Sequence, residues 1–502
     1  MGYSALEVYP VEAEVDIHRG LPSVTLVGLA DTAVRESRDR VRSAIKNSGF
    51  EFPAQRITIN LAPANIKKEG THFDLAIALG VISSSRQANL DLSSHFILGE
   101  LSLEGGVRQV RGVFPMALRA KAEHKKLIVP LANAKEAALV RDLDIYPVKS
   151  LTEAAAFLSG MLEIKPVKVN WEEILKKEPD YALDFSEVKG QLFARRALEV
   201  AVSGMHNIIL IGPPGVGKTM LSRRLPTILP DMEFEEILEV TKIYSIAGLL
   251  EEEKPLIKER PYRSPHHTSS SVALVGGGTN VRPGEVTLAH QGVLFLDELP
   301  EFKRDGLEAL RQPLEDGFVY ISRIAKQARF PSRFLLVAAM NPCPCGYFGS
   351  QSKSCHCPSY QIQKYRHKIS GPLLDRIDIH IELSEIKTKD LISSKGLAES
   401  SSSIKERVEK ARIIQRERFK GEKIFFNAQM NHRQLKEFCT LDMEAKGILE
   451  MAIKHFSFSA RAYDKILKVS RTIADLAGRE SIGPEDISEA IQYRSMDKNL
   501  WV

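Results

Sequence analysis

The middle of the chain contains the octapeptide Gly212-Pro213-Pro214-Gly215-Val216-Gly217-Lys218-Thr219, which fits the pattern G-x-x-x-x-G-K-[ST] at every fixed position. An apolar segment of buried-strand length, 207–211, precedes it, and 220–225 follows as the start of a helix. In such a unit the glycines let backbone N–H groups surround an anion, and the helix N-terminus adds its positive end. The stretch therefore predicts a phosphate-binding loop rather than a chance glycine-rich turn. Lys218 would reach the β- and γ-phosphates of a nucleoside triphosphate, and Thr219 would bind Mg²⁺.

The composition is that of a soluble globular protein. The chain has 502 residues, too many for one core, which suggests about two to four domains. Its net charge of +5 permits a nucleic-acid partner but does not argue for one. No apolar run is long enough to cross a bilayer, and the first residues lack the pattern of a signal peptide. We therefore expect a cytoplasmic protein with no membrane partner.

Hydrophobic patterning divides the chain into four parts. Residues 1–165 mix alternating strands (12–17 and 56–61) with helices such as 30–47, which Asp31 can cap, and this mixture predicts an α+β domain. Residues 166–185 are polar and contain two prolines, as in a linker. The strands predicted in 186–384 are continuous apolar runs, typical of a parallel sheet covered on both faces in an α/β fold. Residues 385–502 are predicted to be mostly helical.

Two further strands of the third part end in polar residues. The apolar run 293–296 is followed by Asp297 and Glu298. At the carboxyl edge of a parallel sheet, beside the phosphate loop, Asp297 could hold the Mg²⁺ shell and Glu298 could polarise an attacking water. The run 334–340 ends in Asn341, which could orient that water; a simple strand-end turn is an equally good interpretation.

The phosphate loop, the Asp-Glu strand and the strand-end asparagine, in this order, resemble an AAA+ ATPase. Four longer phrases resemble its magnesium-chelatase-like branch and, within that branch, the YifB/ComM family of bacterial proteins. They are Ser264-Pro265-His266-His267, 274–278, 282–285 and Gly371-Pro372-Leu373-Leu374-Asp375-Arg376. The resemblance extends over essentially the whole chain. It implies an AAA+ core with a helical lid, ATP and Mg²⁺ as cofactors, and no small-molecule substrate other than ATP.

The resemblance also implies a role for each site residue. Asp297 and Glu298 match the Walker B pair, and Asn341 matches sensor 1. Arg376 matches the arginine finger that reaches into a neighbouring subunit, and Arg461 matches sensor 2 at the head of a lid helix. An arginine suits such roles because its charge is permanent and its donors are fixed in a fork. From the residues alone, an intramolecular salt bridge would be the preferred interpretation of both arginines. A finger given to a neighbour requires an oligomer, and AAA+ relatives form rings, usually homo-hexamers.

A cysteine-rich loop directly follows Asn341. It has the pattern C-x-C-x9-C-x-C. Four thiolates in two close pairs can surround Zn²⁺ tetrahedrally, although the C-x-C spacing is tighter than the usual C-x2-C. Reactive thiols, a loop disulfide or a metal-free loop remain alternatives. The candidate zinc ligands are Cys343, Cys345, Cys355 and Cys357.

Basic residues on a predicted hairpin suggest contact with DNA. The segment 317–333 resembles the hairpin that precedes sensor 1 and projects into the pore in this branch. Its side chains Arg323, Lys326, Arg329 and Arg333 could follow the phosphates of a translocating strand, although a solvated hairpin explains the same composition. Residues 268–280 are rich in Ser and Gly and could form a second pore loop.

The first part resembles a Lon-protease-like domain of the ribosomal S5 type, but its catalytic dyad is replaced. His72 stands where the serine is expected, and Arg108 stands where the lysine is expected. Since Arg108 stays protonated, it cannot act as a general base, and we expect no proteolysis.

These features together favour a ring-forming AAA+ motor that hydrolyses ATP to translocate single-stranded or branched DNA. The resemblance to the YifB/ComM family implies helicase or branch-migration activity in DNA uptake and recombination. The alternatives are a magnesium-chelatase-type subunit, an ATP-dependent protease and a chaperone-like remodeller of protein complexes.

Overall fold

The structure is a computed structural model, and the residues that it describes are 1–4, 6–171, 174, 181–278, 281–323, 326–385, 399–422, 424–456 and 458–495. The chain forms two compact units. One unit contains Met1–Glu178 and Phe234–Lys258, and the other contains Pro179–Glu233 and Glu259–Val502. Among the described residues, no helix combines the length and the apolar character needed to span a bilayer.

The amino-terminal unit is α+β, as predicted. In one of its three-stranded sheets, β5 lies between the antiparallel β3 and the parallel β4, and a second, fully parallel sheet has the order β10-β9-β6. The elements are β1 Gly2–Ser4, β2 Glu7–Tyr9, β3 Glu12–His18, β4 Ser23–Val27, α1 Thr32–Asn47, β5 Arg56–Ala62, α2 Asp74–Ser84, β6 His95–Ile97, β7 Glu100–Leu101, β8 Val107–Arg108, α3 Val113–Ala122, β9 Lys126–Pro130, α4 Ala134–Ala137, β10 Ile145–Val148, α5 Leu151–Leu158 and α9 Phe234–Ala247.

Helix α1 begins as the sequence predicts. The Asp31 side chain accepts a hydrogen bond from the Val34 N–H at 2.8 Å, which satisfies one free donor at the helix N-terminus. The residues that face the core recur at helical spacing and are fully buried; they include Val34, Val41, Ala44 and Ile45.

Helix α9 belongs to this unit although it follows the phosphate loop in the chain. The Ser245 hydroxyl donates to the buried Glu136 carboxylate at 2.6 Å, and the Ser245 carbonyl accepts from the Gly112 N–H at 3.0 Å. The sequence-based boundary of 186–384 includes α9 in the nucleotide-binding part, because hydrophobic patterning does not show which partner a helix will pack against. The domain limits given by the sequence, 1–165, 166–185, 186–384 and 385–502, stay a prediction.

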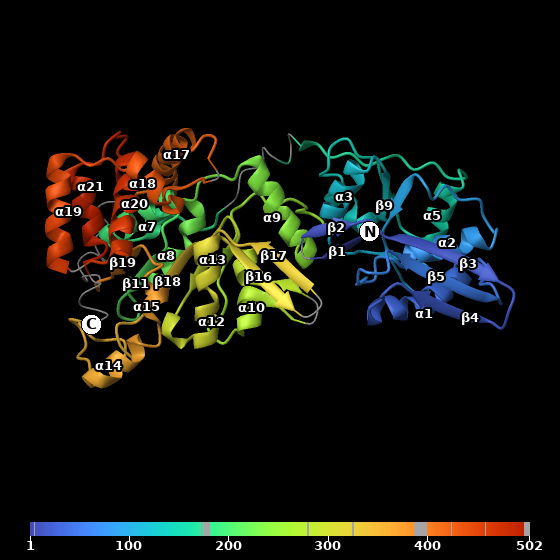
Figure 1. Ribbon diagram of the computed structural model, residues 1–502, viewed down its shortest axis with the longest axis horizontal. Helices are drawn as coiled ribbons and strands as arrows, with labels where there is room; N and C mark the ends of the chain where they lie inside the picture. Colours follow the sequence, from blue (N-terminus) through green and yellow to red (C-terminus); the bar gives the residue numbers. More distant parts are fainter. Residues whose placement is uncertain are drawn as a thin grey trace. The chain divides into compact units, whose positions relative to one another are not determined.

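The second unit is built on a five-stranded, fully parallel sheet with the order β12-β15-β18-β11-β19. Strands β18, β11 and β19 of this sheet are labelled in Figure 1. All residues of β11, β15 and β18 are buried, which explains why these strands are continuous apolar runs. The sheet and its flanking elements are η2 Phe185–Glu187, α7 Leu192–Gly204, β11 Ile208–Ile211, α8 Lys218–Arg223, η3 Leu225–Thr227, β12 Tyr262–Arg263, α10 Ser271–Val275, β13 Gly276–Gly277, β14 Arg282–Pro283, α11 Glu285–Leu288, β15 Val293–Leu296, η4 Leu299–Glu301, α12 Arg304–Ala309, α13 Arg311–Asp316, β16 Phe318–Arg323, β17 Lys326–Pro331, β18 Leu335–Met340, α14 Ser359–Arg366, α15 Gly371–Leu374 and β19 Ile379–Glu382.

A helical region follows the sheet in the chain and packs against α7. It consists of α17 Ser401–Arg418, η5 Asn427–Gln429, α18 His432–Phe438, α19 Met443–Phe456, α20 Ala460–Leu476 and α21 Pro484–Gln492. Together with the parallel sheet it gives the architecture expected of an AAA+ core with a carboxyl-terminal helical lid.

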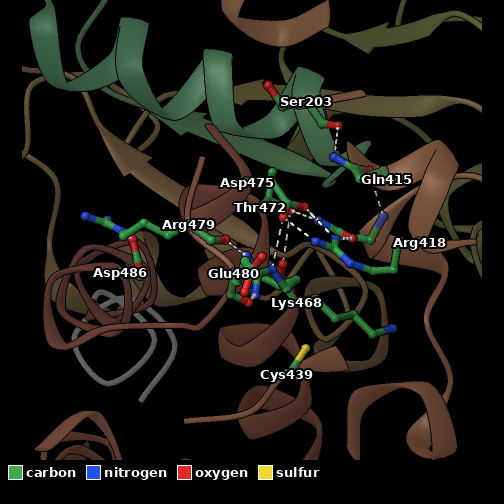
Figure 2. Close-up of polar contacts among 12 residues, drawn as sticks. Ser203, Gln415, Arg418, Cys439, Lys468, Thr472, Asp475, Arg479, Glu480 and Asp486 are labelled. Atoms are coloured by element: carbon green, nitrogen blue, oxygen red, sulfur yellow. Dashed lines mark hydrogen bonds and ion pairs between the residues drawn. The ribbon is translucent and has the colours of Figure 1, made fainter. Parts of the chain in front are cut away.

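Buried polar contacts join the helical region to the core (Figure 2). The Asp475 carboxylate accepts from Arg418 at 2.7 Å and from Arg471 Nε at 3.0 Å, and both Asp475 and Arg471 are almost completely buried. The Gln415 side-chain amide donates to the carbonyl of Ser203 on α7 at 2.9 Å. These contacts satisfy buried charges and fix the packing of α17 and α20 on α7.

His206, immediately after α7, belongs to the same contact region. Its Nε2 lies 2.7 Å from the Thr472 hydroxyl, and its Nδ1 lies 3.9 Å from the Asp378 carboxylate. The ring is completely buried, and this burial lowers the pKa of His206 to about 4, with Lys465 and Lys468 acting in the same direction and Asp378 opposing them.

Candidate functional site

The phosphate loop connects β11 to α8 with the backbone shape that anion binding requires. Gly215 and Gly217 have φ of 85° and 94°, in the left-handed region that glycine adopts without strain. At Gly212 a side chain is excluded, because a Cβ there would lie 2.7 Å from the Leu383 carbonyl oxygen. The loop and its glycines therefore match the sequence prediction, including the strand before it and the helix after it.

Lys218 is buried at the centre of this loop. Its ammonium donates to the carbonyls of Gly212 and Pro213 at 2.6 and 2.9 Å and to Asn341 Oδ1 at 3.0 Å. Burial lowers the pKa of Lys218 to about 8, although Asp297 and Glu298 oppose this shift. The contacts hold the ammonium beside the loop, where the charge of a triphosphate would favour its protonated form.

Three polar strand ends meet at one edge of the sheet, as the sequence predicts. β11 pairs with β18 and β18 pairs with β15, all in parallel, so the loop, Asn341 and Asp297 emerge side by side. The Thr219 hydroxyl donates to Asp297 Oδ2 at 2.7 Å. Hydroxyl and carboxylate oxygens are ligands that Mg²⁺ prefers, so this pair fits the predicted metal site.

Glu298 has an unusual backbone. Its φ of 52° and ψ of 47° lie in the left-handed region, which is costly for a residue with a side chain. Its N–H donates to Asp297 Oδ1 at 2.9 Å, and its exposed carboxylate lies 3.2 Å from His267 Nδ1. The sequence reasoning missed this partner, although His267 belongs to the quoted phrase Ser264-Pro265-His266-His267.

The two predicted arginines lie at the amino ends of the strands, opposite the edge that carries the phosphate loop. Arg376 precedes β19 and is bonded to Glu315 of α13 and, at 2.7 Å, to the Pro372 carbonyl. Its own carbonyl accepts from the side chain of Asn207, the residue before β11, at 3.1 Å. Arg461 lies 3.6 Å from Asp375. The structure therefore brings Arg376 and Arg461 together, near the amino end of β11, whereas the phosphate loop follows its carboxyl end.

A pocket of about 670 Å³ opens at this edge. Arg376, Arg461, Glu315 and Asp375 line it together with residues of the helical region, and the residues described around it do not include the phosphate loop. The salt bridges to Glu315 and Asp375 agree with the interpretation that the residues alone favoured for both arginines. They also show that neither guanidinium is directed at the phosphate loop of its own chain.

The four loop cysteines converge. Their sulfur atoms all lie within 4.8 Å of one another, and Cys343 is buried while Cys345 is exposed. The backbone N–H groups of Phe348 and Cys357 point at the sulfurs of Cys343 and Cys355 at 3.3 and 3.4 Å. Four sulfur donors with N–H support fit a tetrahedral Zn²⁺ site.

The hairpin predicted before sensor 1 is formed by β16 and β17, with Phe318 opposite Pro331. Arg329 lies over the rings of Phe318 and Tyr320, at 3.5 and 5.6 Å from their centroids, and Tyr320 is half exposed. The side chains of Arg323 and Lys326 lie outside the described residues. In the amino-terminal unit His72 is buried, which lowers its pKa to about 3, and Arg108 is exposed on β8.

Three family models match the chain in the order of its parts. "Subunit ChlI of Mg-chelatase" matches residues 13–133, "Magnesium chelatase, subunit ChlI" matches 184–391, and the carboxyl-terminal model of the same subunit matches 398–494. With the parallel-sheet core and the helical lid, these matches define a magnesium-chelatase-like AAA+ protein.

Relatives narrow the class to a family. The chain is 43% identical over 495 residues to competence protein ComM of Haemophilus influenzae, covering 98% of this chain and 95% of the relative. It is 42% identical over 492 residues to the uncharacterized protein YifB of Escherichia coli, with the same coverage. Lon protease 2 of Bacillus subtilis is 28% identical over 148 residues, which are 27% of this chain and 26% of that protein. The chain belongs to the YifB/ComM family.

Proposed function

We propose that this protein is a ring-forming, cytoplasmic motor that couples ATP hydrolysis to the movement of DNA. The observation that carries the proposal is the division of the catalytic groups between the two edges of one parallel sheet. Lys218 contacts Asn341 and Thr219 contacts Asp297 at the carboxyl edge, whereas Arg376 lies at the amino edge. A site divided in this way is completed by a second copy of the chain.

The groups at the carboxyl edge suit phosphoryl transfer to water. Lys218 and the backbone N–H groups from Gly212 to Thr219 bind the β- and γ-phosphates, and Thr219 and Asp297 hold Mg²⁺, which neutralises phosphate charge. Glu298 orients and polarises the attacking water once its carboxylate leaves His267. Asn341, bonded to Lys218 in this structure, orients the water and the γ-phosphate.

The groups at the amino edge act on the neighbouring subunit. Arg376 supplies the arginine finger, which in other systems accelerates hydrolysis by about 10³–10⁵. Arg461 lies beside Asp375 in the same pocket and acts as sensor 2, together with Arg376. Head-to-tail contacts of this kind close into a ring when the rotation allows it, and we propose a homo-hexamer.

The hairpin β16–β17 is the proposed contact with DNA. Arg329 and Arg333 carry positive charge, and the exposed ring of Tyr320 offers a stacking surface for a base. The name of the Haemophilus influenzae relative, a competence protein, agrees with a role in the handling of DNA. We also propose that Cys343, Cys345, Cys355 and Cys357 bind one Zn²⁺.

ATP turnover by the purified full-length protein, measured with single-stranded, duplex and branched DNA, tests the motor. We expect turnover that depends on Mg²⁺ and rises with at least one form of DNA, accompanied by strand displacement. Turnover that no DNA form changes, with no displaced strand, would falsify the DNA part. Stimulation by a porphyrin instead of DNA would favour a chelatase-type subunit.

Mixing two inactive variants tests the divided site. Glu298→Gln should bind ATP but hydrolyse it very slowly, and Arg376→Ala should bind ATP and also fail to hydrolyse it. In mixed rings some interfaces combine an intact Glu298 with an intact Arg376, so activity should return. The control is Arg433→Ala, which removes an exposed arginine of α18 and should leave turnover unchanged. Normal turnover by Arg376→Ala would refute the donated finger.

A further inference from the structure

The cysteine loop is continuous with the candidate catalytic groups. Only Pro342 separates Asn341 from Cys343, the most buried of the four cysteines. Asn341 in turn accepts a hydrogen bond from Lys218 of the phosphate loop at 3.0 Å. A displacement of Cys343 would therefore be transmitted through the backbone of Pro342 to Asn341, and through the side-chain hydrogen bond of Asn341 to Lys218.

A second contact joins the cysteine loop to the phosphate loop directly. Gly346 follows Cys345 and has a φ of 86°. A Cβ at this position would lie 2.8 Å from Cδ of Pro214 and 3.8 Å from Cγ of Asn341. The backbone of Gly346 is thus packed against the ring of Pro214 with no room for a side chain.

The other side of the cysteine loop is held by α14. Arg366 Nε donates to the Pro342 carbonyl at 3.2 Å, and its guanidinium lies 5.3 Å from the ring of Phe348. The segment between the two cysteine pairs is rich in Gly and Ser and buries few apolar side chains. Apart from the hydrogen bonds that the Ser350 and Ser352 hydroxyls donate to Glu385, convergence of the four sulfurs is the main interaction that can order it, and thiolates so close together need a cation between them.

We propose that Zn²⁺ in the cysteine cluster acts as a brace for the ATP site, so that ATP binding and turnover depend on the metal. The inference rests on the proposed ATPase activity and on the proposed zinc site. Bound zinc fixes Cys343 and Cys345, and these hold Asn341 beside Lys218 and Gly346 against Pro214. Without the metal, the loop loses its main ordering interaction and both contacts with the phosphate loop weaken.

Two glycines of the loop provide a matched pair of variants. Gly346 and Gly349 have similar φ values of 86° and 78°, so alanine adds similar backbone strain at both positions. Only at Gly346 does the new Cβ meet Pro214, since nothing lies within 4 Å of a Cβ at Gly349. We expect Gly346→Ala to retain one Zn²⁺ per chain while its kcat falls about tenfold or more. Gly349→Ala should stay close to the wild type in zinc content and kcat.

A second substitution distinguishes a local clash with Pro214 from general misfolding of Gly346→Ala. Pro214→Ala removes the Cγ and Cδ atoms that the new methyl group meets. The double variant Pro214→Ala/Gly346→Ala should therefore bind and hydrolyse ATP better than Gly346→Ala alone. If the effects of the two substitutions simply add, the contact does not transmit the effect and the brace is refuted.

Removal of the metal tests the same inference without mutation. The full-length protein is treated with a zinc-selective chelator, returned to excess Mg²⁺, and assayed for zinc content, binding of a fluorescent ATP analogue and turnover. We expect weaker binding and slower turnover, both restored by one equivalent of Zn²⁺. Unchanged binding and turnover after complete zinc loss, or fresh protein that binds no zinc, would overturn the proposal. Wild-type protein that binds the analogue without hydrolysing it would contradict the proposed ATPase, and the binding assay would still test the brace.

Discussion

The buried His206 makes the stability of the second unit depend on pH in a direction that the structure specifies. Burial lowers its pKa from 6.5 to about 4. Between these values the unfolded chain binds a proton that the folded chain does not. Stability is therefore highest above about pH 6.5 and is lost as the pH falls towards about 4. His206→Gln removes the titration and keeps an amide that can bond to the Thr472 hydroxyl.

The magnitude follows from the two pKa values. At about pH 5, His206 is almost fully protonated in the unfolded chain but only about one-tenth protonated in the folded chain. This difference makes folding about 2 kcal/mol less favourable than at about pH 7.5, where both states are largely neutral. The acids and bases facing the ring are Asp378, Lys465 and Lys468, and these are unchanged in the variant.

The assay compares urea unfolding of the wild type and of His206→Gln at both pH values by far-UV circular dichroism. The fixed cost of the substitution cancels in the comparison, and so do the titrating groups that do not interact with His206. We expect the wild type to lose about 2 kcal/mol more than the variant between about pH 7.5 and about pH 5. Replacing the exposed His432 by Gln should leave the pH dependence as in the wild type. Equal losses in the wild type and in His206→Gln would refute the reasoning.

Three further outcomes follow from described contacts. Lys218→Ala should weaken ATP binding about 100-fold or more, because charge-assisted bonds to two phosphates are lost; calorimetry that finds near-normal affinity would contradict this. Asp475→Ala leaves the buried Arg471 without its carboxylate and should lower the free energy of unfolding by about 3–5 kcal/mol in urea titrations, whereas a loss below about 1 kcal/mol would show that the pair is replaceable. Tyr320→Ala should weaken single-stranded oligonucleotide binding by about 1–3 kcal/mol in fluorescence anisotropy, whereas Tyr320→Phe should retain it, and equal affinities of the two variants would argue against stacking.

The sequence predicted those parts of the fold that local patterns determine. The strand predicted at 293–296 has the predicted limits and the one predicted at 207–211 is observed at 208–211, because a run of apolar residues between polar ends specifies a strand covered on both faces. Arg461 lies at the head of a helix of the carboxyl-terminal region, α20, as predicted, because Ser459 caps this helix through the N–H of Ala462. The assignment of α9 to the amino-terminal unit was not predictable, because it depends on contacts with residues more than a hundred positions away, such as Glu136.

The candidate site, like the fold, could be predicted from the sequence only in part. The neighbours of the phosphate loop were predictable, since the carboxyl ends of parallel strands share one edge. The contact of His267 with Glu298 and the left-handed backbone of Glu298 were not, because neither leaves a periodic or compositional signal. The pairing of Arg376 with Glu315 also depends on a fold that brings together residues far apart in the sequence.

Strand β11 connects the phosphate loop to the residues around Arg376. Its carboxyl end leads into the phosphate loop, and at its amino end Asn207 contacts Arg376, Leu336 and Asp378. Four extended residues span about 13 Å, and a strand held by a partner on each side resists compression. The strand therefore connects the phosphate loop rigidly to Asn207, which contacts Arg376, the arginine that we propose acts on the neighbouring subunit. In the proposed ring, nucleotide bound in one subunit would therefore act on the arginine offered to the next subunit, which favours sequential over random hydrolysis.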